Sequence, residues 1–126
     1  MSYVYFLVRL KKPPISSLRE LKDDVVDDWD FTVDDLRNKL SELYPSTKWE
    51  WREVRYEVGP MSVLRGQVRG AASRFEFAIE TWPFYRLRID GSYNVDQTQE
   101  IIELAKRLGL SVIDMQTGER IYLQDK

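Results

Sequence analysis

Between residues 48 and 90, hydrophobic and polar positions alternate with a period of two, which is typical of strands that bury one face. The alternation is clearest in residues 75–79 and 85–89, where most intervening positions are charged. A short connection at residues 82–84 separates these two segments. The pattern therefore predicts a hairpin with one apolar face and one charged face.

Residues 48–58 and 63–69 predict two further strands, with Gly59 and Pro60 in the turn between them. In the first of these strands the hydrophobic positions are odd-numbered as far as Trp51 and even-numbered from Val54 onward. Such a shift indicates either a change of buried face or a bulge near Glu53.

Two segments instead show the spacing of three and four that is typical of amphipathic helices. Thr32 and Asp35 form an N-terminal cap signal before the first, which ends at Pro45. Asn94 and Gln97 cap the second, a helix of about fifteen residues that Gly109 terminates.

The remaining elements are shorter or less clearly marked. Residues 3–10 are rich in aromatic and β-branched types and predict a central strand covered on both faces. A capping box at Ser17 and Glu20 predicts a helical turn over residues 18–26. Residues 110–113 and 119–123 predict a small terminal hairpin.

Together these elements predict a single α+β domain over residues 1–126. We expect a two-layer sandwich: a mainly antiparallel sheet of about five to six strands, with two principal helices on one face. The chain of 126 residues is 43% hydrophobic, which is sufficient for one core. The order of the strands beyond the hairpin does not follow from the pattern.

The composition limits the chemistry that this chain can perform. With no cysteine and no histidine, it cannot form a disulfide scaffold, a Ser-His-Asp triad or a His- or Cys-ligated metal site. A carboxylate pair such as Asp90 and Asp114 is the remaining catalytic candidate, without any sign in the sequence that the two meet. We therefore expect a protein that is not an enzyme and has no cofactor.

The most unusual local feature is an acidic segment. Residues 16–35 hold eight acidic residues against two basic ones, Arg19 and Lys22. One interpretation is a solvated surface whose carboxylates cap a helix. Another is a docking surface for a basic protein, with Trp29 as an aromatic anchor. A calcium or magnesium site is a third, although the acids lack the EF-hand spacing. The candidate partner-binding residues are Asp23, Asp24, Asp27, Asp28, Trp29, Asp30, Asp34 and Asp35.

The strand block also carries arginines close to aromatic residues, a combination that can bind single-stranded nucleic acid. Glutamates on the same strands offer a simpler explanation, namely Arg–Glu pairs across a solvated sheet face. The formal net charge of −2 and the absence of an RNA-recognition motif favour that explanation. We expect no nucleic-acid partner.

A small cysteine-free α+β chain with an acid-rich segment resembles the immunity proteins of bacterial contact-dependent and other polymorphic toxin systems. Residues 108–119 also look like the tail of many small bacterial proteins. The resemblance implies an inhibitor that binds a toxin domain, often a nuclease, and covers its basic cleft. The acidic segment would then stand in for nucleic-acid phosphates.

Two alternatives belong to other functional classes. The aromatic residues Trp49 and Trp51 can supply the surface of a homo-oligomeric structural or regulatory module, and a carboxylate- and metal-dependent enzyme is the third class. The longest wholly apolar run, residues 3–8, is followed by basic residues and does not have the order of a signal peptide. We expect a cytoplasmic protein, monomeric or homodimeric, with no membrane partner.

Overall fold

The computed structural model describes residues 2–10, 26–27, 29, 31–69, 74–82, 85–92, 95–115 and 120–122. These residues form eight strands and two helices, which makes the protein α+β as predicted. The elements are β1 (Ser2–Leu10), β2 (Val26–Asp27), α1 (Val33–Leu43), β3 (Lys48–Tyr56), β4 (Gly59–Arg69), β5 (Arg74–Glu80), β6 (Arg86–Ser92), α2 (Val95–Leu108), β7 (Ser111–Asp114) and β8 (Arg120–Tyr122).

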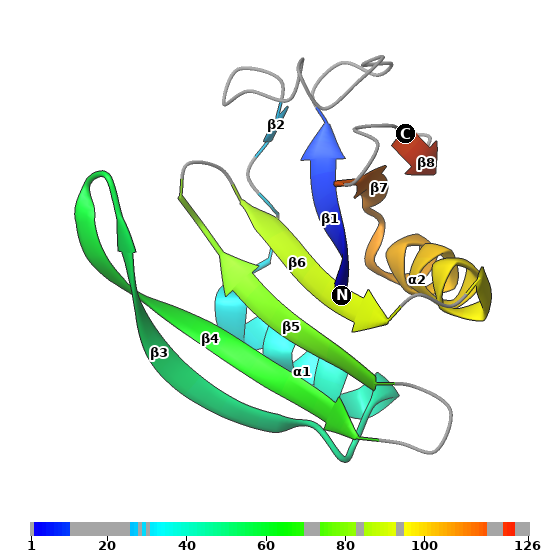
Figure 1. Cartoon of the computed structure of the whole chain (residues 1–126), viewed down its shortest axis with the longest axis horizontal. Helices are drawn as coiled ribbons and strands as arrows, with labels where there is room; N and C mark the ends of the chain where they lie inside the picture. Colours follow the sequence, from blue (N-terminus) through cyan, green and yellow to red (C-terminus); the bar gives the residue numbers. More distant parts are fainter. Residues whose placement is uncertain are drawn as a thin grey trace.

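The strands form an antiparallel sheet in the order β3-β4-β5-β6-β1-β7-β8 (Figure 1). The two-residue strand β2 pairs with the end of β1, off this path. The sheet thus has seven strands along its path, and the expected five to six were too few. The number is higher because the short terminal hairpin joins the main sheet, through the pairing of β7 with β1.

Strand β1 lies in the interior of the sheet, between β6 and β7, as its apolar composition predicted. Tyr5 and Leu7 face the main hydrophobic cluster, and the alternate residues Phe6 and Val8 are buried as well. A strand that hides both sets of side chains has no solvated side, so it carries no polar alternation.

The main hydrophobic cluster joins both helices to the sheet. Helix α1 contributes Leu36 and Leu40, and α2 contributes Ile101, Leu104 and Ala105. In Figure 1, α1 crosses behind β4 and β5, whereas α2 lies beside β7. The helices and the sheet therefore share one continuous core.

The start of α1 and the end of α2 are as the sequence predicted, whereas Asn94, the expected cap of α2, lies outside the described residues. At the start of α1, the side chain of Thr32 accepts a hydrogen bond from the backbone of Asp35, whose carboxylate accepts one from the backbone of Thr32 (both 3.1 Å). At the end of α2, Gly109 has a φ of 69°, and the next residue, Leu110, donates its backbone N–H to Ala105 (2.9 Å). This 6→1 bond is the Schellman ending, which favours glycine.

The β3–β4 hairpin resolves the ambiguity around Glu53. The two strands pair without a register shift, and their turn is formed by Glu57 and Val58, two positions earlier than the expected Gly59 and Pro60. There is no bulge; instead the buried side changes along β3. The ring of Trp49 lies over Gly66, where an added Cβ would come within 2.7 Å of it, so the close approach requires glycine.

The helical turn expected over residues 18–26 lies outside the described residues, except for Val26, which is in β2. Neither helix of the described chain has both the length and the apolar character that crossing a membrane would need.

Candidate functional site

The structure describes only part of the acidic segment. Asp23, Asp24, Asp28 and Asp30 lie outside the described residues, and Asp27 is described through its backbone in β2. Trp29, Asp34 and Asp35 are described in full, and they occupy two very different environments.

Trp29 belongs to the core and is only 7% exposed. Its indole stacks on Phe31 at a centroid distance of 5.1 Å and meets Tyr85 edge-on at 5.6 Å. An anchor that inserts into a partner must be accessible in the free chain, and Trp29 is not accessible in this fold. The tryptophan instead packs in the hydrophobic core of the protein itself.

Asp34 and Asp35 lie on the first turn of α1, where the helix dipole favours negative charge. The Asp34 side chain is 72% exposed, and its nearest described cation, Arg37, is 3.9 Å away. The carboxylate of Asp35 is exposed too but accepts the capping hydrogen bond. Asp34 is consequently free to meet a partner's charge, whereas Asp35 also serves the fold.

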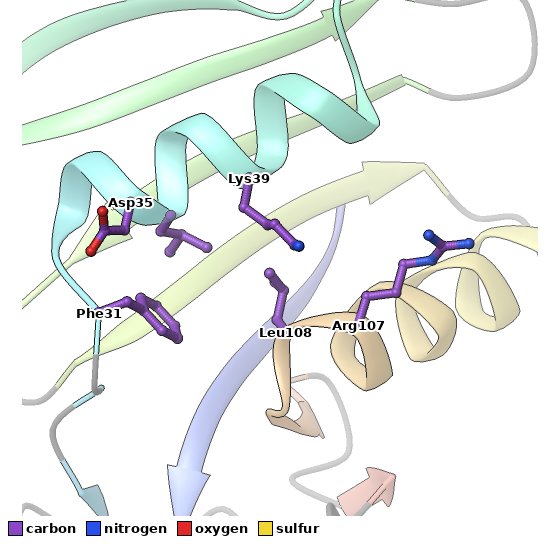
Figure 2. Close-up of a pocket in the computed structure, with 6 residues that line it drawn as sticks. Phe31, Asp35, Lys39, Arg107 and Leu108 are labelled. Atoms are coloured by element: carbon purple, nitrogen blue, oxygen red, sulfur yellow. The ribbon is translucent and has the colours of Figure 1, made fainter.

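A hollow of about 200 Å³ lies between α1 and α2, directly beside this helix start (Figure 2). Its apolar lining is Phe31, Leu36 and Leu108. Lys39 from α1 and Arg107 from α2 add cationic groups, and Asp35 stands at its α1 end. The hollow can take an apolar side chain of moderate size, with positive charge at its rim.

Polar contacts connect α1 to the elements beside it. The hydroxyl of Tyr44, just after α1, donates to Glu100 of α2 at 3.0 Å. Burial first, and then the charge and hydrogen bond of Glu100, raise the pKa of Tyr44. At the other side of α1, the indole N–H of Trp49 donates to Ser41 at 3.0 Å. These contacts tie α1 to both α2 and β3.

The structure also contains a second cluster of polar residues, which the sequence did not predict. Its two charged members belong to the alternating pattern of the β5–β6 hairpin. Glu80 and Arg86 form an ion pair of 3.1 Å whose side chains are 8% and 10% exposed. The Tyr56 hydroxyl donates to the same carboxylate, and the Arg86 guanidinium lies 4.7 Å from the centre of the Phe6 ring. The alternation predicted the Arg–Glu pairing, but not that this pair is buried.

The environment of Tyr56 makes the stability of the protein sensitive to alkaline pH. Burial, followed by the hydrogen bond to Glu80, raises the pKa of Tyr56 from 10 to about 12. Because the folded state holds this proton more tightly, its contribution is complete below pH 10 and is lost as the pH rises toward 12. We expect Tyr56→Phe to reduce the fall in unfolding free energy across this range. Urea unfolding at several pH values measures the unfolding free energy, and phenolate absorbance measures the ionisation of the tyrosines. If the unfolding free energy falls with pH equally steeply in the Tyr56→Phe protein, Tyr56 is not the source of the pH dependence.

The carboxylate pair considered for catalysis does not come together. Asp90 pairs with Val4 and Asp114 with Tyr5, and these consecutive residues of β1 point to opposite faces of the sheet. Of the strand-block arginines, Arg52 pairs with Glu50 and Arg88 with Asp90, each within its own strand. In the described part of the chain, no three carboxylates gather closely enough to hold a metal ion.

The candidate site is therefore the start of α1 together with the adjacent hollow. The sequence indicated the acidic residues of this site but not the hollow. The hollow could not be found from the sequence because the residues that form it lie about seventy positions apart, on the two helices. Comparison of the chain with protein-family models, with curated proteins and with solved structures finds no match.

Proposed function

We propose that this chain is a non-catalytic protein-binding module, an inhibitor of the immunity-protein type that neutralises a basic toxin domain. Its contact surface comprises the acidic segment and the hollow between α1 and α2. The observation that carries the proposal is that Trp29 is buried in the core while Asp34, on the first turn of α1, is exposed, because a folded body then presents this carboxylate to a partner.

Attachment matters for the strength of binding. A charged segment that is held in place loses less conformational freedom on binding than a free one, so more of the interaction energy remains as affinity. Trp29 and Phe31 provide this attachment, and the capping box of Thr32 and Asp35 orients the first turn of α1. The role of the tryptophan in the proposal is thus to position the acids and not to touch the partner.

The hollow supplies the apolar element that Trp29 does not. A partner that fits both parts would present basic side chains to the acidic segment and an apolar side chain to Phe31, Leu36 and Leu108. The cations Lys39 and Arg107 at the rim would repel a uniformly basic surface and favour one with a carboxylate beside the apolar side chain. Charge would speed the encounter, and the apolar contact would slow release.

Charge reversal tests the acidic contact. The reversal variant combines Asp24→Lys, Asp28→Lys and Asp34→Lys and leaves the capping residue Asp35 in place. Its matched control changes three exposed glutamates elsewhere, Glu42, Glu76 and Glu103, to lysine. Both alter the net charge equally. We expect the reversal variant to weaken binding at least about tenfold and to reduce the dependence of binding on salt, with little effect of the control.

The partner is first captured with the unmodified chain from a lysate of the source cell, and its toxic activity is then assayed with each variant. Loss of inhibition with the reversal variant alone would support the proposal. Equal capture by all three proteins, or a captured protein whose activity the chain does not reduce, would refute it. Circular dichroism establishes that each variant is folded.

A further inference from the structure

Strand β3 forms one edge of the sheet, with β4 as its neighbour on one side (Figure 1). It runs over nine residues without a proline and pairs with β4 in unbroken register. Among the described residues, no element pairs with its outer edge. A long regular edge strand presents a row of backbone donors and acceptors to any other strand of matching length.

The side chains along this edge are exposed, including one large aromatic. Trp51 is 59% exposed, and Glu50, Arg52, Glu53 and Arg55 around it are exposed as well. An exposed tryptophan in the middle of an open edge strand leaves apolar surface in water that a neighbouring strand would cover. The edge therefore carries both unused backbone groups and an apolar centre.

We propose that two copies of this chain pair antiparallel along β3, with the two-fold axis at Trp51, so that the two sheets become one. The inference is independent of the inhibitory function. It rests on the symmetry of strand pairing, the charges on β3 and the exposure of Trp51.

Symmetry restricts the possible registers. Two identical antiparallel edge strands can be related by a two-fold axis that runs midway between them. They continue one sheet only if one residue lies opposite its own copy at this axis, because opposite residues must point to the same face. An axis at Glu50, Arg52, Glu53 or Arg55 would place two like charges directly opposite each other, which destabilises a pair. Trp51 and Val54 are the uncharged alternatives within residues 50–55.

With the axis at Trp51, the two tryptophans lie opposite each other, and Glu50 of each copy lies opposite Arg52 of the other. Within one copy these two side chains already form an ion pair of 2.6 Å on the same face of β3. Pairing would combine the two ion pairs into a ring of four alternating charges, a network that is worth more than isolated surface pairs. An axis at Val54 would likewise place Glu53 opposite Arg55, but it would leave Trp51 opposite Glu57, in the hairpin turn.

Charge-swap variants test the pairing through the dissociation constant of the dimer, measured by analytical ultracentrifugation. Glu50→Lys and Arg52→Glu should each weaken the dimer about tenfold or more, because each change makes two symmetric attractions repulsive. The double variant has the original net charge and restores both attractions, so it should dimerise like the unmodified chain. Arg55→Glu is the matched control for Arg52→Glu and should leave the dimer intact.

Disulfide trapping tests the register separately, which is convenient because the chain has no cysteine of its own. Opposite residues of antiparallel strands have Cα atoms about 4.5–5.5 Å apart, within the range that a disulfide spans. Trp51→Cys should therefore cross-link rapidly on oxidation, and Val54→Cys should not. An unmodified chain that stays monomeric at every accessible concentration would overturn the proposal. So would preferential cross-linking of Val54→Cys, or a dimer that Arg55→Glu weakens as much as Arg52→Glu does.

Discussion

Replacing Phe77 with alanine is expected to lower the free energy of unfolding by about 3–5 kcal/mol. The side chain is completely buried in the middle of β5. Its ring contacts three other aromatic rings, those of Tyr44 at 5.7 Å, Trp49 at 6.1 Å and Phe75 at 6.2 Å. The change would remove apolar contacts and leave a cavity in the part of the core where α1, β3 and β5 meet. Domains are commonly stable by only about 5–15 kcal/mol, so the loss is a large fraction.

Urea unfolding followed by far-ultraviolet circular dichroism measures this loss. The control is Val58→Ala, which truncates an exposed side chain in the β3–β4 turn and should change the stability by less than about 0.5 kcal/mol. Phe77→Leu should fall between the two because it retains much of the buried volume. Equal midpoints for the Phe77→Ala and Val58→Ala proteins would show that this aromatic cluster does not hold the fold.

The second large effect is expected at Glu80. Glu80→Ala should cost about 3–5 kcal/mol, because it leaves the largely buried guanidinium of Arg86 without the carboxylate it faces at 3.1 Å. It also removes the acceptor of the Tyr56 hydroxyl. The cost therefore includes the desolvation of two polar groups whose bonds to Glu80 are lost.

A double-mutant cycle with Arg86→Met separates the pair from its surroundings. If burial of the charge is the cause, the double variant should be markedly more stable than the sum of the two single effects predicts. Additive losses, measured by urea unfolding at neutral pH, would contradict the coupling. Glu76→Ala is the control, since it removes an exposed glutamate from the same strand.

The two proposed interactions use separate residues. Inhibition depends on the acidic segment and on the hollow between α1 and α2, and self-pairing depends on β3 at the sheet edge. The charge-swap variants at Glu50 and Arg52 leave every residue of the acidic segment unchanged, so they test dimerisation without altering that contact. A chain that dimerises through β3 would carry two copies of the inhibitory surface, which raises avidity only for a partner that is itself multivalent.

The sequence alone determined the elements whose signals are local. The capping box of Thr32 and Asp35, the glycine ending of α2 at Gly109 and the alternation of β5 and β6 each depend on residues a few positions apart. Neighbours along the chain are enough to specify such features, because the hydrogen bonds and the periodicity involved span one or two turns of helix or one strand.

Only the tertiary structure decided the features that depend on distant residues. The placement of β1 between β6 and β7 requires pairing across eighty positions or more, and the pairing of β1 with β7 brought the terminal hairpin into the sheet. Trp29 looked like a surface residue among aspartates, yet Phe31 and Tyr85 bury it. The alternation placed Glu80 and Arg86 on a solvated face, whereas in the structure Tyr56 contacts Glu80 and Phe6 contacts Arg86. In each case burial depends on which segments meet in space, and the local alternation of residue types does not contain that information.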